Sequence, residues 1–421
     1  MITKKMVVLS VVASLVFVSD AAEQQPSKPP IAQAWIDLST VSSNMPNMGA
    51  MGARGGRPGA MMGNMFGGGK DANGGNSFGN TRAMAAAGRW MDVTLMTHNN
   101  PSLQTGTQAV PEGSKLAPTI ALVSPEGTPP PAPVVGKQQA RDEEEPAPEF
   151  KQPKGKISLY WGCSSTVRPG QPRVLDMATA QPQDFAGFFQ SRHATTKGTH
   201  STPGQPIWPN KTDSRMIAPD ASLVGEHVFT GDGVPDGFRV NIDPGHDLMP
   251  AIDLSTHDDD TSTILDWQAI GSARAYFLAS MGSRGEGDMV VWTSSELPDF
   301  GMGLIDYQPN GSIDGWLKEK VLLAPTVTEC AIPKEVLGKH GMVRMIAYGN
   351  EMDVAYPARP KNPKQTWEPQ WAAKVRLKSV SMTILGMQNQ GRDGNTNNPN
   401  PDKPQPSTPS PLNVIKGIFG H

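Results

Sequence analysis

The chain of 421 residues contains two cysteines, Cys163 and Cys330, which are its clearest candidates for covalent chemistry. In an oxidising compartment a lone pair of cysteines tends to form a disulfide bond. Cys163 follows the strand-like segment 157–161, and Cys330 lies in the alternating segment 326–332. The alternative is two buried thiols that act as small apolar core residues. Both alternatives stay open here, because sequence spacing does not show whether the two Cα atoms come within about 7 Å.

Other reactive residue types do not gather into a convincing site. His257 is followed by three aspartates at 258–260, but consecutive carboxylates cannot all face one Ca²⁺ ion, so we expect a solvated loop. The Gly/Met-rich segment 45–79 offers soft thioether ligands without any His or Cys, so we assign it no copper site. Because geometry rather than inventory defines a catalytic triad, the sequence predicts no catalytic residue, no cofactor and no metal.

The N-terminus has the pattern of a secretory signal peptide. Two lysines precede an apolar run at residues 6–18, and Ala21 and Ala22 follow as small residues at a cleavage site. The run is too short to span roughly 30 Å of hydrocarbon as a helix. We therefore expect removal of residues 1–21, no transmembrane span in the mature chain, and export to the periplasm, the outer membrane or the outside.

Composition argues against one uniform globule. Glycine (44 residues) and proline (40 residues) make up about a fifth of the chain, against roughly 12 % in an average protein. The formal net charge is −3 and aromatic residues are 6 % of the chain. A general nucleic-acid binder would show a strong basic excess, so we expect no nucleic-acid partner.

The N-terminal part of the mature chain, residues 22–124, predicts a small β-containing region. The segments 34–40 and 89–95 share one pattern of Trp, apolar, Asp, apolar, Ser or Thr. Alternation of this kind predicts two strands of one sheet, with the Gly/Met-rich segment 45–79 as an insertion between them. Coincidence in such a short pattern is the alternative.

Beyond this region, residues 125–155 form a Pro-rich, acidic linker that we expect to be extended. The main folded region is predicted at residues 156–387, and a Pro- and Asn-rich tail at 388–421 is predicted to be disordered. Within the main region, many short alternating segments indicate strands, and one helix is predicted to start at Ser312. The predicted fold class is therefore mainly β: a β-sandwich with a short inserted helix and extended disordered segments.

One part of the main region resembles a known module. Residues 263–385 are similar to bacterial fibronectin type III-like or Ig-like modules, through Leu265, Trp267, Tyr276 and Leu278 and a later strand at 343–349. The resemblance implies that residues 265–278 turn back at a Gly-Ser pair as a hairpin, with those four side chains on one core side. The whole chain also resembles exported proteins of Gram-negative bacteria to which no activity is assigned.

A second, weaker resemblance concerns His246. The segment 240–246 is similar to the strand end that supplies the first zinc ligand in N-acetylmuramoyl-alanine amidases. An open zinc site would need a Glu and a second His further along the chain. No Glu occurs between Glu226 and Glu286, and a Pro-Gly β-turn explains the same residues.

These observations lead to two hypotheses of different classes. The favoured one is an exported, envelope-associated binding or structural protein, not an enzyme, whose partner is an unknown envelope or surface component. The alternative is a periplasmic metal-dependent hydrolase that uses His246. Stoichiometric zinc in the purified protein would favour the alternative.

Overall fold

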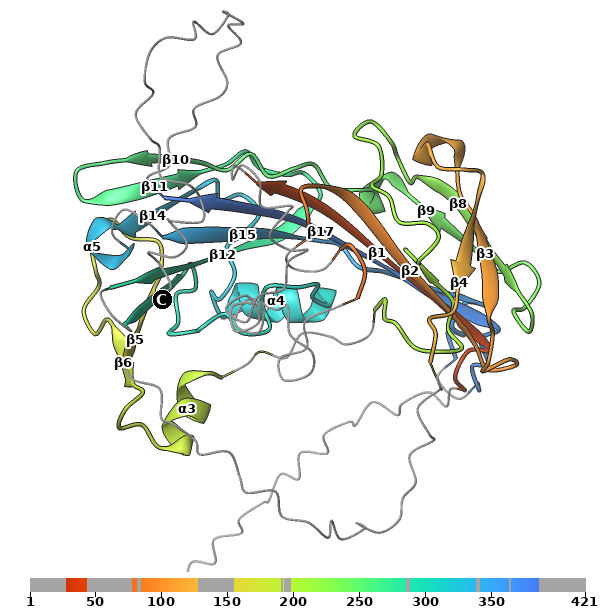
Figure 1. Cartoon of the computed structure of the whole chain (residues 1–421), viewed down its shortest axis with the longest axis horizontal. Helices are drawn as coiled ribbons and strands as arrows, with labels where there is room; N and C mark the ends of the chain where they lie inside the picture. The colour runs from red at the N-terminus through yellow and green to blue at the C-terminus, as the bar shows by residue number, and fades with distance from the viewer. Residues whose placement is uncertain are drawn as a thin grey trace, which may run out of the picture.

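The computed structural model describes residues 28–43, 78–81, 85–127, 155–190, 192, 198–284, 288–337, 341–362 and 365–385. The predicted signal peptide with Ala21 and Ala22, most of the Gly/Met-rich segment and the predicted tail lie outside these residues. Within them the chain is mainly β, which confirms the predicted fold class at that level (Figure 1). No helix among the described residues is both long and apolar enough to cross a membrane.

The elements are numbered in chain order. The strands are β1 (Ala32–Ser43), β2 (Gly88–Thr97), β3 (Thr105–Ala109), β4 (Thr119–Val123), β5 (Lys156–Trp161), β6 (Arg173–Asp176), β7 (Ile207–Trp208), β8 (Gly225–Gly231), β9 (Arg239–Ile242), β10 (Ser255–Asp258), β11 (Ser262–Asp266), β12 (Ala273–Ser283), β13 (Met289–Thr293), β14 (Glu329–Pro333), β15 (Met342–Gly349), β16 (Met352–Tyr356) and β17 (Trp371–Ile384). The helices are α3 (Pro182–Phe188), α4 (Asn310–Lys318) and α5 (Lys334–Leu337), with short 3-10 turns η1 (Glu112–Ser114) and η2 (Pro244–His246).

Within the described residues, fourteen strands form one mixed sheet. Its order is β6-β5-β13-β12-β15-β17-β1-β2-β7-β4-β3-β8-β9, and β16 pairs with β17 beside this path. Two of the pairings are parallel, β1 with β17 and β5 with β13. Figure 1 shows this sheet as a long twisted layer, with β10, β11 and β14 over one end and β3, β4, β8 and β9 at the other.

The centre of the sheet joins the two ends of the described chain. β1 and β2 pair antiparallel, as the shared Trp-apolar-Asp pattern predicted, with Asp37 opposite Asp92. On its other edge β1 pairs in parallel with β17, from Ala32 opposite Trp371 to Ser43 opposite Met382. The predicted separation of residues 22–124 from a main region at 156–387 therefore does not hold as a division into folded units. Local alternation marks a strand, but it does not mark the distant strand with which it pairs.

The small sheet covers one face of the large one. β11 pairs with β10 and β14, whereas β12 pairs with β13 and β15, so the hairpin expected over residues 265–278 is wrong. Instead the chain crosses from one sheet to the other. The four resembling residues still share one buried core, and the Trp267 and Tyr276 rings lie 5.6 Å apart between centroids. The fibronectin type III-like assignment stays a prediction.

Cys163 and Cys330 form a disulfide bond, with their Cα atoms 5.0 Å apart. Cys330 lies on β14 opposite Leu265 of β11, and Cys163 follows β5, at the end of the large sheet that the small sheet covers (Figure 1). The bond therefore links the small sheet to the large one. The two cysteines are not free thiols.

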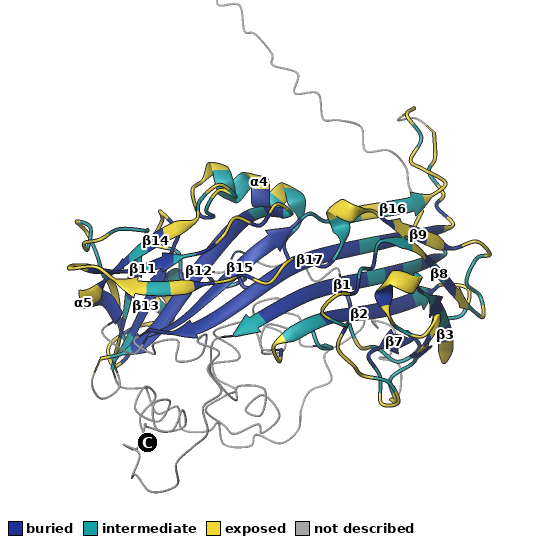
Figure 2. Ribbon diagram, turned by 90° about the horizontal axis from the view of Figure 1, so that it is seen from above, coloured by how far each residue is buried: buried dark blue, intermediate teal, exposed yellow. Residues whose placement is uncertain are grey.

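The opposite face of the large sheet carries α4 and the loops beside it. Figure 2 shows α4 over the buried strands β12, β15 and β17. Ile313 of α4 is buried among Phe277, Ile346 and Val380 of those strands. The helix predicted from Ser312 is present and begins two residues earlier, at Asn310.

If the two ends of the chain form one sheet, a cut between them should not separate them. We predict that a protease site inserted within residues 128–154, between β4 and β5, yields two pieces that co-elute in gel filtration without denaturant. The disulfide cannot hold them together, because both cysteines lie in the C-terminal piece. Separation of the pieces into a folded C-terminal fragment and a free N-terminal fragment would contradict the β1–β17 pairing.

Candidate functional site

A groove with a volume of about 750 Å³ lies where β1, β16 and β17 run side by side. We call it the indole groove, because two tryptophans line it. Its lining comprises residues 33–35 of β1, 353–355 of β16, 372–374 of β17, and Ala358, Arg359 and Trp367 from the connection between β16 and β17.

The two indole rings are held in place by neighbouring groups. Trp35 meets the imidazole of His200 edge-on, with 5.0 Å between ring centroids. Trp367 donates its Nε1 hydrogen to the carbonyl oxygen of Pro357 at 3.0 Å, and the Arg359 guanidinium lies 5.4 Å from its ring centroid. Both tryptophans are half-buried, so each ring is fixed by the protein while part of its surface stays accessible. Rigid aromatic rings of this kind lose little conformational entropy when a ligand packs on them.

Charged groups stand beside the rings. The Lys374 ammonium lies 2.7 Å from a Glu351 carboxylate oxygen and 2.8 Å from one of Asp353. Asp353 is exposed, whereas the Glu351 side chain is 8 % exposed. Burial raises the pKa of Glu351 and Lys374 opposes that rise. The groove therefore combines an apolar surface with hydrogen-bonding groups of both charge signs.

The same face of β1 and β17 continues inward as a row of buried charges. Two residues beyond Trp35 and Lys374, Asp37 and Arg376 lie opposite each other. Arg376 donates Nε and Nη2 hydrogens to the two Asp37 oxygens, at 2.6 and 2.5 Å. Burial alone would lower the pKa of Arg376, but Asp37 raises it above its ordinary value. Such a two-pronged pair fixes the positions of both side chains.

One turn of chain covers this ion pair. Thr199 donates both its backbone N–H and its hydroxyl to Asp37, at 3.1 and 2.5 Å. Gly198 lies so close to Arg376 that a Cβ atom would collide with the guanidinium. His200, which follows Thr199, donates its backbone N–H to the Thr94 hydroxyl and accepts a hydrogen bond from that hydroxyl at its carbonyl oxygen. Its imidazole contacts Trp35. The segment 198–200 thus connects the buried ion pair with the indole groove.

A second buried pair follows on β17. The Lys378 ammonium donates to Asp306 at 2.7 Å, and its side chain is fully buried. Burial lowers the pKa of Lys378. The Tyr307 ring lies against both cations, 4.1 Å from Lys378 Nζ and 4.4 Å from Arg376 Cζ, and its hydroxyl donates to the Leu38 carbonyl. These contacts anchor the loop before α4 to the sheet.

Asp92 of β2 stands opposite Asp37 and has its own partners. Its carboxylate accepts hydrogen bonds from the backbone of Asn80 and Thr81 and from the Thr81 hydroxyl, at 2.6–2.9 Å. Burial raises the pKa of Asp92 to about 7, with the nearby Asp37 as a smaller cause in the same direction. Asp92 is therefore poised to change charge near neutral pH.

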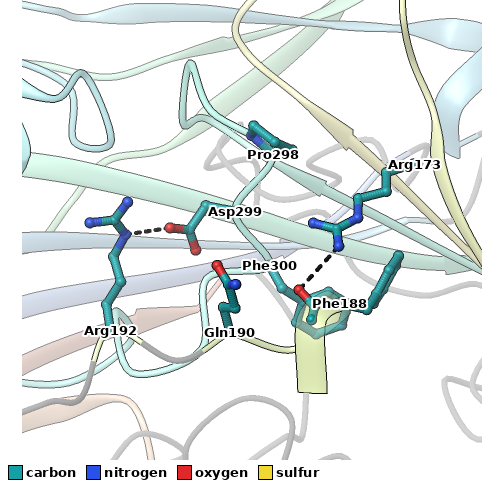
Figure 3. Close-up of a pocket in the computed structure, with 8 residues that line it drawn as sticks. Arg173, Phe188, Gln190, Arg192, Pro298, Asp299 and Phe300 are labelled. Carbon is teal, nitrogen blue, oxygen red and sulfur yellow. Dashed lines mark hydrogen bonds and ion pairs between the residues drawn. The ribbon is translucent and has the colours of Figure 1, made fainter. Parts of the chain in front are cut away.

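A smaller pocket of about 280 Å³ lies beside α3. Figure 3 shows the Arg192 guanidinium turned toward Asp299, with Phe300 and Phe188 nearby. Arg192 is paired with Asp299 and with Glu319, and Arg173 donates to the Gly187 carbonyl at 3.1 Å. Because these guanidinium groups already have partners within the protein, they are less available to bind an anionic ligand than the residue types of the pocket suggest. The indole groove is the stronger candidate.

The residues singled out from the sequence do not meet in one site. His246 hydrogen-bonds Asp243 through Nδ1 at 2.9 Å and Asn350 through Nε2 at 3.1 Å. His257 lies 2.8 Å from Asp266. In the parts of the chain that the structure describes, no three His, Cys, Asp or Glu side chains gather as a metal site would require. Among those residues, the Glu and the second His that would complete a zinc site are thus not found beside His246.

Sequence reasoning missed the groove itself. Trp35 was identified only as a strand residue, and Arg359 and Trp367 lie in a connection without periodicity. The signal that could have found them is a pair of tryptophans at the two ends of the chain, but it has meaning only once β1 and β17 are paired. A Gly-x-Ser-x-Gly pattern also occurs at residues 75–79, and its Ser77 lies outside the described residues.

The raised pKa of Asp92 predicts that stability falls as pH rises. Below about pH 4 the carboxyl is protonated in both states, and between pH 4 and 7 only the unfolded chain ionises. The folded state thus loses up to about 4 kcal/mol relative to the unfolded state by pH 8, at roughly 1.4 kcal/mol per pKa unit. Urea unfolding of wild type and Asp92→Asn from pH 4 to 8 measures this loss. We expect the unfolding free energy of the variant to change less with pH than that of wild type. An identical pH dependence in both proteins would contradict the raised pKa of Asp92.

Comparison with known proteins gave no match to any family model and no significant match to a curated protein.

Proposed function

We propose that the protein is an exported binding protein of the cell envelope, and that the indole groove contacts its partner, an envelope or surface component. The observation that carries this proposal is the pair of fixed, half-buried indole rings in one groove. Tryptophan is enriched at binding hot spots, because it offers a large apolar area with few rotatable bonds.

Two further features support a binding role. The groove volume falls within the roughly 300–1,000 Å³ of ligand sites in proteins. β1 and β17 belong to the centre of the sheet, so Trp35 and Lys374 stand on rigid strands, whereas Trp367 and Arg359 come from the connection between β16 and β17. The N-terminal pattern of basic start, apolar run and small residues supports export.

Fractionation of the native cell tests both parts of the proposal. We expect the full chain with a C-terminal tag to sediment with envelope material and to begin after Ala21 or Ala22. The double variant Trp35→Ala/Trp367→Ala should move to the exported soluble fraction, because it loses both ring surfaces. Tyr356→Ala is the matched control: Tyr356 is exposed on β16, but it stacks on Trp371 and does not line the groove.

Thermal unfolding of all three proteins checks that they are folded. A mature protein that keeps Met1 and stays in the cytoplasm would contradict export. A folded double variant that sediments like wild type would contradict the assignment of the groove.

A further inference from the structure

We infer that the indole groove binds a neutral glycan chain. This inference rests on the proposed function and specifies the chemistry of its partner. It is argued from the shape of the aromatic surface, from the charge of the groove and from the space available.

The aromatic surface fits a sugar ring. A pyranose has one face of C–H groups and a rim of hydroxyls, and so it needs a flat apolar surface with polar groups at its edge. Trp35 and Trp367 offer flat indole surfaces, and their orientations are set by His200 and by the Pro357 carbonyl. Aromatic side chains combine a large apolar contact area with tolerance of polar neighbours.

The charges of the groove cancel. Among the lining residues Lys374 and Arg359 carry positive charge and Asp353 carries negative charge, and Glu351, which lies outside the lining, adds a second carboxylate through its ion pair with Lys374. A strongly anionic or cationic ligand would find no excess of the opposite sign. The lining groups Lys374, Arg359 and Asp353, together with Gln33 on β1, supply hydrogen-bond donors and acceptors in one groove. Hydroxyl groups both donate and accept, so a neutral glycan can use both kinds.

A second class of ligand that packs on aromatic rings is a Pro-rich peptide in the extended polyproline conformation. Its prolines have no N–H group, so such a peptide offers acceptors only and can pair with the donors of the groove but not with its acceptors. The volume of about 750 Å³ also gives room for more than one linked sugar ring. These observations favour the glycan.

Isothermal titration of the full mature chain tests the inference. The probes are cellohexaose and chitohexaose, two neutral pyranose chains, and a decaproline peptide as the competing class. We expect binding of at least one hexasaccharide and none of decaproline. Trp367→Ala and Asp353→Ala should each weaken the binding by about tenfold or more, while Tyr356→Ala should leave it unchanged. Asp353 is exposed, so the Asp353→Ala variant should stay folded. The test therefore remains valid even if the Trp367→Ala variant fails to fold.

Three outcomes would overturn the inference: no binding of either hexasaccharide, equal binding by the groove variants, or binding of decaproline in their place. Its failure can be distinguished from failure of the proposed function. If envelope association depends on Trp35 and Trp367 but neither hexasaccharide competes for it, the binding function stands and the glycan does not.

Discussion

Asp37 and Arg376 form a two-pronged ion pair between the first and the last strand that the structure describes. Their side chains are 0 % and 4 % exposed, so either group alone would leave a charge in surroundings that solvate it poorly. A slip of one residue between β1 and β17 would turn one of the two charges to the other face of the sheet. The pair therefore favours one register over its neighbours, and the parallel pairing at the centre of the sheet depends on that register.

The same register places the groove. Trp35 lies opposite Lys374, two residues from the ion pair on both strands. The register that the ion pair favours therefore makes the indole and the ammonium of the groove neighbours. Segment 198–200 adds a second constraint, because Thr199 binds Asp37 while His200 contacts Trp35. Buried ion pairs are weak evidence for stability, since apolar residues of similar volume can often replace them without loss. We attribute to this one a role in specifying the pairing and, through it, the shape of the candidate site.

Much of the local structure could be predicted from the sequence, and the long-range structure could not. Alternation located β1 and β2, and the shared Trp-apolar-Asp pattern predicted that β1 pairs with β2. No local signal joins Asp37 to Arg376, which are 339 residues apart. Lys374, Arg376 and Lys378 alternate with apolar residues, which is typical of a strand with one solvated face, yet Arg376 and Lys378 are buried because acidic partners arrive from β1 and from the loop before α4. Trp267 and Tyr276 share a core as predicted, but their strands lie in different sheets, because packing rather than backbone pairing brings them together.

A double-mutant cycle on Asp37 and Arg376 tests the central claim most directly. Urea unfolding would be measured for wild type, Asp37→Leu, Arg376→Met and the double variant. We expect each single substitution to lower the free energy of unfolding by about 3–5 kcal/mol, since it leaves a buried charge without its partner. The double variant should recover much of that loss, with a coupling energy on the order of 3 kcal/mol. Additivity of the two single effects to within about 0.5 kcal/mol would contradict the claim that this pair holds β1 and β17 in register.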